Sequence, residues 1–134
     1  MILLDTSFIV AYLNTADQNH GKAMAINEKL DRGDHGAVAI TDFIFDEVMT
    51  VMLNKIKDAR KASSEGDKLL GMQFFKVDAF VFERTREIFK NQTGHRLSFT
   101  DCSTIAVSEI HAIPKLATFD EEFKKVRHIK VIGV

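Results

Sequence analysis

Five short runs of apolar residues recur along the chain, and each has the length of a β-strand. They cover residues 1–4, 37–40, 74–77, 115–118 and 129–134. Each run is nearly continuous in apolar residues, which is typical of strands that are covered on both faces. The pattern therefore predicts a central sheet of about five strands that is flanked by helices.

Segments of helical character lie between these runs, at roughly residues 7–13, 20–31, 42–55, 57–71, 79–91, 99–111 and 120–126. The clearest stripe of apolar residues at helical spacing consists of Ile44, Val48, Val51, Met52 and Ile56. Because strands alternate with helices along the chain, we expect an α/β fold with a mainly parallel sheet.

The composition is that of one globular domain. The chain has 134 residues, of which 46% are hydrophobic and 28% are charged, and most domains have roughly 100–150 residues. We therefore expect a single domain over residues 1–134. The formal net charge of −1 provides no global basic field for a nucleic acid, although a local basic patch would suffice.

The N-terminus and the cysteine content indicate a cytoplasmic protein without a membrane anchor. Cys102 is the single cysteine, which excludes an internal disulfide and fits a reducing compartment. The first residues lack a basic leader and are interrupted early by Asp5, unlike a signal peptide. No apolar run approaches the ~18 residues of a membrane span. We expect Cys102 to pack inside a helix layer.

Carboxylates occur near the ends of the predicted strands. Asp5 directly follows the first run, and Asp120 comes shortly after the fourth. Glu47 lies one to two turns into the helix after the second run, and Asp101 begins the helix at 99–111. Ligands of parallel α/β sheets bind beyond the carboxyl ends of the strands. We therefore expect these four side chains to gather at one edge of the sheet.

Three of the four carboxylates have an alternative role as helix caps. Asp5 and Asp120 each precede a predicted helix and could accept hydrogen bonds from its first amides. The spacing of a capping box occurs at Ser98–Asp101 and again at Thr118–Glu121. Capping would explain these residues without any catalytic function.

Glu47 cannot be explained as a cap, because it lies in the middle of a helix. Its neighbours at helical spacing place it at the border of the apolar stripe, whereas Asp46 has a wetter position. It needs a cation or a hydrogen-bond donor there, or its pKa must rise. Several carboxylates at one place repel one another, and a divalent metal ion relieves this repulsion. Ligands that are all oxygen favour Mg²⁺ or Mn²⁺ over zinc, and the five histidines are scattered without ligand spacing.

Four segments carry these acids in order: ILLDTSFIVAYL with Asp5, DFIFDEVMTVML with Glu47, LSFTDCSTIAVSEIHAI with Asp101, and LATFDEEF with Asp120. In this order and at these spacings the chain resembles PIN-domain ribonucleases, most closely the VapC-type toxins of prokaryotic toxin–antitoxin pairs. The resemblance covers the full length. It implies a PIN-like fold and a metal-dependent endoribonuclease that hydrolyses RNA phosphodiester bonds with Mg²⁺ or Mn²⁺.

The resemblance also implies roles for individual residues. The catalytic and metal-binding positions would be Asp5, Glu47, Asp101 and Asp120, with Asp5 and Asp101 as direct ligands. Thr6 and Thr118 would orient carboxylates by hydrogen bonds. The neighbouring Glu121 and Glu122 remain alternatives to Asp120 as the fourth acid.

An acidic cleft repels RNA, so basic residues are required on its rim. The candidates are Lys55, Lys57, Arg60, Lys61, Arg96, Lys124 and Lys125, followed by Arg84, Arg86, Arg127, His128 and Lys130. The alternative is that these cations are ordinary solvent-exposed residues on the outer faces of helices.

The resemblance further implies a homodimer and a small antitoxin as partners. Eleven phenylalanines are more than one small core readily hides, so we expect some of them at an interface and most in the core. The phenylalanines in question are Phe43, Phe45, Phe74, Phe75, Phe80, Phe82 and Phe89. Alternative functions are a PIN-domain nuclease of RNA processing without a toxin role, a catalytically silent PIN fold that only binds, and a metal-dependent phosphatase.

Overall fold

Five parallel strands form the centre of the molecule in the computed structural model, which describes residues 1–134. The strands are β1 (Ile2–Leu4), β2 (Val38–Thr41), β3 (Gln73–Phe75), β4 (Lys115–Ala117) and β5 (Lys130–Ile132). They are ordered β3-β2-β1-β4-β5, and every neighbouring pair is parallel. The predicted α/β fold with a parallel five-stranded sheet is confirmed.

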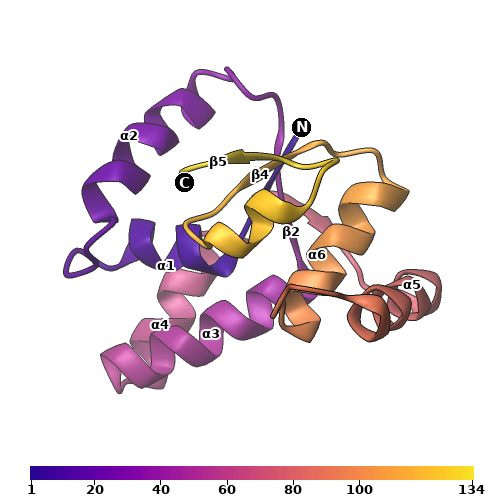
Figure 1. Cartoon of the computed structure of the whole chain (residues 1–134). Helices are drawn as coiled ribbons and strands as arrows, with labels where there is room; N and C mark the ends of the chain where they lie inside the picture. Colours follow the sequence, from indigo (N-terminus) through magenta and orange to yellow (C-terminus); the bar gives the residue numbers. More distant parts are fainter.

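Six α-helices and one 3₁₀ helix connect the strands (Figure 1). They are α1 (Thr6–Leu13), α2 (His20–Asp31), α3 (Asp42–Ile56), α4 (Ala59–Asp67), α5 (Ala79–Asn91), α6 (Phe99–Ile110) and η1 (Glu121–Lys125). The predicted helix at 57–71 is shorter at both ends. Lys57 adopts a left-handed conformation with φ 57°, and Asp58 then caps a new helix by accepting from the amides of Arg60 and Lys61. None of the helices combines the length and the apolarity of a membrane span.

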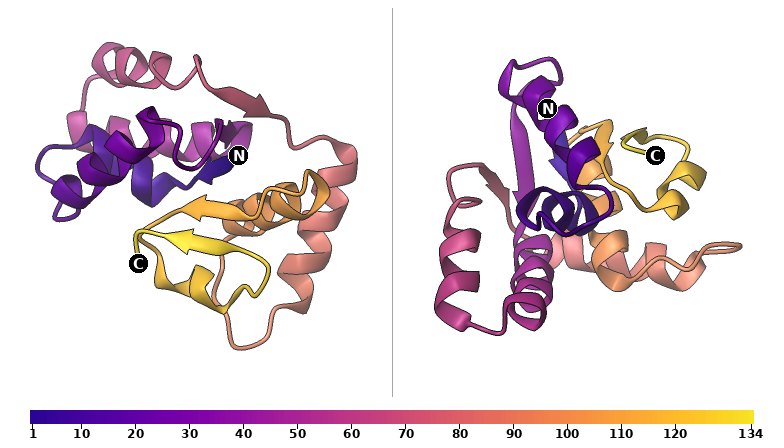
Figure 2. Two further views of the ribbon diagram at one scale, coloured as in Figure 1. Left: turned by 90° about the horizontal axis from the view of Figure 1, so that it is seen from above. Right: turned by 90° about the vertical axis from the view of Figure 1, so that its left-hand side faces the viewer.

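The two faces of the sheet bury two separate apolar clusters. Ile2 and Leu4 of β1 face a cluster with α1, α2, α3 and α4, whereas Leu3 faces a second cluster with α5, α6 and η1. This alternation is the expected period of two along a strand. Figure 2 shows α5 and α6 on the side of the molecule away from α2.

The edges of the sheet differ from the prediction that all strands are covered on both faces. β1 is fully buried, but the outer strands β3 and β5 each contain one exposed and two half-buried residues. They have only one neighbouring strand, so one edge meets solvent. The apolar runs at 74–77 and 129–134 therefore describe strands at the borders of the core.

The phenylalanines fall into two groups. Phe45 and Phe74 pack against one apolar cluster and Phe75 against the other. Phe80 and Phe82 on α5 remain exposed to 72% and 41%, and Phe89 on the same helix is also exposed. Only Phe8 and Phe123 are fully buried, so most of the phenylalanines lie at the border of the core and not at its centre.

The strand order creates a switch point between β1 and β4. The chain leaves β1 towards β2 on one side of the sheet and returns to β4 on the other side. Leu4 pairs with Ala117 in register, so the residues that follow these two strands emerge side by side. Crevices at such points are where open α/β sheets bind ligands, and Asp5 and Thr118 stand there.

Candidate active site

A cleft of about 780 Å³ opens at this switch point. Its walls include the four acids predicted from the sequence, which are Asp5, Glu47, Asp101 and Asp120. The remaining lining residues are Thr6, Ser7, Val10, Asp17, Gln18, Asn19, Val51, Ser98, Phe119 and Glu121. No lysine or arginine lines the cleft. The structure thus gathers carboxylates from four separate segments around one cavity.

Asp5 is the most deeply buried of these acids, with 3% of its surface exposed. Its Oδ2 atom accepts hydrogen bonds from the Thr118 hydroxyl at 2.7 Å and from the hydroxyl and the amide of Ser7. Burial raises the pKa of the Asp5 carboxyl, and the bonds from Ser7 and Thr118 oppose this rise. Asp5 also caps α1, as the alternative interpretation predicted.

The two hydroxyls that bind Asp5 also contact backbone amides, and their oxygens lie 3.1 Å from each other. Ser7 Oγ accepts from the amide of Phe119 at 2.9 Å, and Thr118 Oγ1 accepts from the amide of Asp120 at 2.9 Å. Each hydroxyl accepts from an amide and donates its own hydrogen to the Asp5 carboxylate. All of these bonds end on Oδ2, so Oδ1 of Asp5 makes none of them.

Asp101 lies in the first turn of α6 and forms a complete capping box with Ser98. Its Oδ2 accepts from the Ser98 amide at 2.7 Å, and its own amide donates to the Ser98 hydroxyl at 3.1 Å. Burial raises the pKa of the Asp101 carboxyl to about 6, with further contributions from the negative charges of Asp5 and Asp120. These mutual effects place the three acids in one electrostatic neighbourhood.

Asp120 caps η1 by accepting from the Glu122 amide at 2.9 Å. The second predicted capping box, Thr118–Glu121, is wrong. Thr118 precedes the cap residue, and its hydroxyl is already used by Asp5 and by the amide of Asp120. Of the alternative fourth acids, Glu121 lines the cleft and Glu122 does not.

Glu47 occupies the half-buried position that its spacing predicted, and Asp46 beside it is exposed. Its Oε2 atom accepts a hydrogen bond from the hydroxyl of Thr6. This contact joins the middle of α3 to the first turn of α1. The donor that Glu47 requires is therefore Thr6, a residue that stands next to Asp5 in the sequence.

Each of the four acids is held by one carboxylate oxygen only. The oxygens without a protein hydrogen bond are Oδ1 of Asp5, Oε1 of Glu47, Oδ1 of Asp101 and Oδ2 of Asp120. No three acidic, histidine or cysteine side chains stand close enough to hold one metal ion. The donors are all oxygen, which suits a hard cation such as Mg²⁺ that binds one or two carboxylates and keeps several waters.

The predicted basic rim is distributed unevenly around the cleft. Lys124 and Lys125 stand on η1 beyond Asp120 and form ion pairs with Glu121 and Glu122. The hydrogen bond from Lys125 lowers the pKa of Glu122. Arg96 is joined to η1 through its backbone amide, which donates to Glu122 at 3.4 Å.

The other cations lie farther from the acids. Lys55 at the end of α3 and Lys57 after it are about 12 Å or more from Glu47 along the helix, and Arg60 and Lys61 stand at the start of α4. Arg84 is paired with Glu87 and Glu109, and Arg86 with Glu83.

Sequence reasoning missed Ser7 as a site residue. Ser7 connects the Asp5 carboxylate to the backbone of Phe119. Its position two residues after a capping aspartate is the only signal in the sequence, because contact with Phe119 depends on the pairing of β1 with β4. The polar residues Asp17, Gln18 and Asn19 of the α1–α2 loop also line the cleft and carry no motif.

Comparisons with known proteins agree with this architecture. The family model described as PIN domain matches residues 2–129. The chain is similar to the solved structure of the sarcin–ricin loop cleaving toxin VapC20 of Mycobacterium tuberculosis, with a TM-score of 0.82, 24% identity and coverage of 94% of this chain and 95% of that one. A search of curated protein sequences found no match.

Two further solved structures share the fold at lower identity. For VapBC2 of Rickettsia felis, bound to a DNA fragment from its promoter, the TM-score is 0.71 with 19% identity and 98% coverage of both chains. For FitAcB of Neisseria gonorrhoeae the TM-score is 0.68 with 19% identity, and the match covers 98% of this chain and 96% of that one.

The raised pKa of Asp101 predicts how stability depends on pH in metal-free buffer. Between pH 4 and 6 the native state binds more protons than the unfolded state, so the free energy of unfolding falls as pH rises through about 6. We expect a loss of about 1 kcal/mol between pH 5 and pH 7.5, since a full pH unit below the pKa corresponds to about 1.4 kcal/mol and solvent screening reduces this value at the half-buried site. Urea denaturation with a chelator measures it.

The variant Asp101→Asn should show a smaller loss of stability over this pH range, because residue 101 no longer titrates. Asp46→Asn on the exposed face of α3 is the matched control. An Asp101→Asn protein with the full wild-type pH dependence would contradict the assignment.

Proposed function

The chain belongs to the PIN domain family, and on this basis we propose that it is a metal-dependent endoribonuclease that hydrolyses RNA phosphodiester bonds. One observation carries the proposal: carboxylates from four segments converge on a single cleft at the switch point of the sheet. We further propose that it acts in the cytoplasm as the toxin of a toxin–antitoxin pair. The structural likeness to VapC20 supports this role.

We assign Mg²⁺ or Mn²⁺ as the cofactor. Asp5 and Asp101 would hold it through their free Oδ1 atoms, and Glu47 and Asp120 would complete the acidic site. Bound there, a divalent cation lowers the pKa of a water molecule and offsets negative charge that develops on the phosphate. The oxygen-only donor set supports this choice over zinc.

The surrounding side chains preorganise the acids. Ser7 and Thr118 fix Oδ2 of Asp5, so that its other oxygen is available to the cleft. Thr6 fixes Glu47, and Ser98 fixes Asp101 in the same way. Such fixed orientation removes conformational freedom before the substrate binds. Glu47 or Asp120 would orient the attacking water towards the phosphorus atom.

The first test of the function is RNA cleavage by the purified protein. We expect cleavage with Mg²⁺ or Mn²⁺, none with chelator, and a loss of about 100-fold or more in Asp5→Asn and Asp101→Asn, as for other single catalytic groups. Asp46→Asn should cleave like the wild type, since its side chain is exposed outside the cleft.

Two outcomes of the cleavage test would decide against the proposal. A wild-type protein that neither binds Mn²⁺ nor cleaves RNA would favour a silent binding module. Hydrolysis of small phosphate esters without any RNA cleavage would favour a phosphatase. Relief of expression toxicity by a neighbouring antitoxin gene separates a toxin from a nuclease of RNA processing.

Removal of rim cations should weaken RNA binding, because fewer contacts with phosphates release fewer counterions from the RNA. For the double variant Arg96→Gln/Lys124→Gln, we expect the slope of log affinity against log salt to become shallower by about 1.4, at about 0.7 per phosphate contact on a single strand. Binding to a catalytically inactive Asp101→Asn protein measures it.

We expect a smaller change in that slope from Lys55→Gln/Lys57→Gln at the distant end of α3. An unchanged salt slope in the first double variant would remove these cations from the binding surface.

We propose that the exposed phenylalanines of α5 form the interface with a second copy of the chain. Phe82 and Phe89 make edge-to-face contacts with Phe99, at centroid distances of 5.5 and 5.7 Å. Phe99 stands two residues before Asp101, so this apolar surface adjoins the acidic cleft. Exposed aromatic side chains that are grouped in this way are typical of protein interfaces.

The variant Phe82→Ser/Phe89→Ser should convert a dimer to a monomer in light scattering, whereas Leu53→Ser, an exposed apolar residue on α3, should not. A wild-type monomer at all concentrations would exclude this interface. The antitoxin proposal is tested by co-purification of the chain with the product of a neighbouring short gene.

A further inference from the structure

The loop that joins α5 to α6 carries Ser98, which holds Asp101, but it lacks a regular framework of its own. No backbone-to-backbone hydrogen bond reaches residues 93–97. At the start of the loop, the side-chain oxygen of Gln92 accepts from the amide of Leu97 at 2.9 Å, and its side-chain nitrogen donates to the carbonyl of Leu97 at 3.1 Å. Leu97 is buried. Side chains therefore determine where this loop lies.

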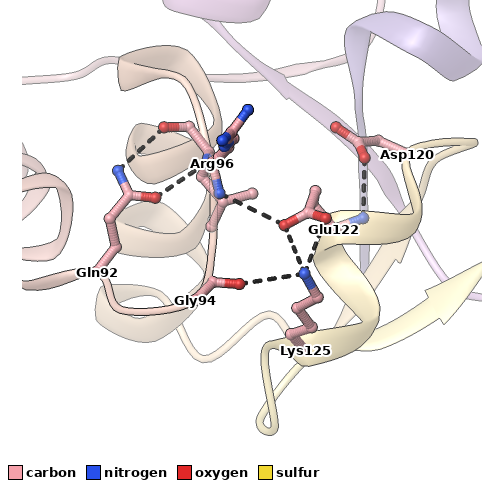
Figure 3. A network of polar contacts seen from close by, with 7 residues as sticks. Gln92, Gly94, Arg96, Asp120, Glu122 and Lys125 are labelled. Atoms are coloured by element: carbon pink, nitrogen blue, oxygen red, sulfur yellow. Dashed lines mark hydrogen bonds and ion pairs between the residues drawn. The ribbon is translucent and has the colours of Figure 1, made fainter.

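From the outside, the loop is joined to η1 at two points by one ion pair (Figure 3). Lys125 donates to both carboxylate oxygens of Glu122 at 2.9 Å and to the carbonyl of Gly94 at 3.2 Å. Glu122 also accepts from the amide of Arg96. The carboxylate and the ammonium thus each bind one backbone group of the loop. We call Glu122, Lys125 and these two contacts the latch.

The backbone of the loop is shaped to accept the latch. Gly94 has φ +70°, in the left-handed region that favours glycine. The Nδ1 atom of His95 is the one buried side-chain polar atom of the molecule without a hydrogen-bond partner. A buried polar atom without a partner is unfavourable, so contacts elsewhere must keep the loop in this conformation. The latch supplies such contacts.

The latch connects two elements that carry different acids of the cleft. Asp120 caps η1 and accepts a hydrogen bond from the backbone amide of Glu122. Glu122 is therefore in direct contact with an acid of the cleft through its backbone. The loop on the other side leads directly into the capping box of Asp101. Figure 3 shows the Arg96 side chain leaving the loop on the side away from Lys125.

We propose that Glu122 and Lys125 are positioning residues, which hold the α5–α6 loop against η1 and so fix Asp101 relative to Asp120. The inference rests on the proposed nuclease function and deepens it. Exposed ion pairs add little to global stability, and these side chains are 34% and 48% exposed. A small misplacement of catalytic groups, by contrast, lowers rates strongly.

The central experiment compares Glu122→Ala with the wild type in RNA cleavage and in amide hydrogen exchange. We expect kcat to fall about tenfold with KM unchanged or lower, because removal of a negative charge cannot weaken the attraction of RNA. Exchange of the hydrogen-bonded amides of residues 96–98 should accelerate about tenfold, with a thermal midpoint close to that of the wild type. Glu122→Gln, which keeps an acceptor for the Arg96 amide, should be intermediate.

Two further variants separate the latch from an ordinary surface ion pair. Glu65→Ala on α4 breaks a matched pair with Lys68, three residues apart and similarly exposed, and should change neither kcat nor loop exchange. The swap Glu122→Lys/Lys125→Glu restores an ion pair but offers no donor to Gly94 and no acceptor to Arg96. It should therefore not recover kcat.

Recovery of wild-type kcat by the swap would overturn the positioning role. So would an unchanged kcat in a Glu122→Ala protein whose loop exchanges faster. Unchanged exchange at residues 96–98 would overturn the latch itself. If the wild type cleaves no RNA, the nuclease proposal fails, and hydrogen exchange still decides whether Glu122 holds the loop.

Discussion

The burial of one carboxylate, that of Asp5, is the constraint on which the site depends. A charged group in this position is unfavourable unless hydrogen bonds compensate it. The compensation comes from Ser7 on α1 and from Thr118 at the end of β4, 113 residues away in the sequence. These partners meet only because β1 and β4 pair in parallel register. The pairing of β1 with β4 therefore also supplies the hydrogen bonds that compensate the burial of Asp5.

The arrangement of strands and helices could be predicted because each apolar run, and each helical stripe of apolar residues, indicates which residues of that segment are buried. The elements agree with the sequence where caps and apolar spacing act together, as in α3, which begins after the Thr41 cap and buries Ile44 and Val48. Disagreement appears where position in the sheet decides. β3 and β5 resemble the central strands in sequence, and only the strand order makes them edges.

The four acids were predicted from the sequence, and Thr6 and Thr118 through the family resemblance, whereas Ser7 was not predicted. A carboxylate at a strand end is visible in the sequence, whereas the donor that satisfies it is a common serine or threonine such as Ser7. The partners in the ion pairs could not be predicted from the sequence either. Lys124 and Lys125 are adjacent in the sequence, yet they bind Glu121 and Glu122, and Lys125 alone reaches across to Gly94. The role of the α5–α6 loop follows from that contact.

Capping and an active site are often treated as competing explanations of an aspartate, and here they are compatible. A cap uses one oxygen of the carboxylate, since the amide that it accepts from lies on one side of the group. Asp5 and Asp120 each cap a helix in this way, Asp101 accepts from the amide of the cap residue Ser98 of α6, and each of the three has its other oxygen outside these bonds. The cap fixes the orientation of the side chain at the helix N-terminus, where the helix dipole also favours a negative charge. The local structure that explains each aspartate is thus the means by which three flexible side chains are held around one cleft.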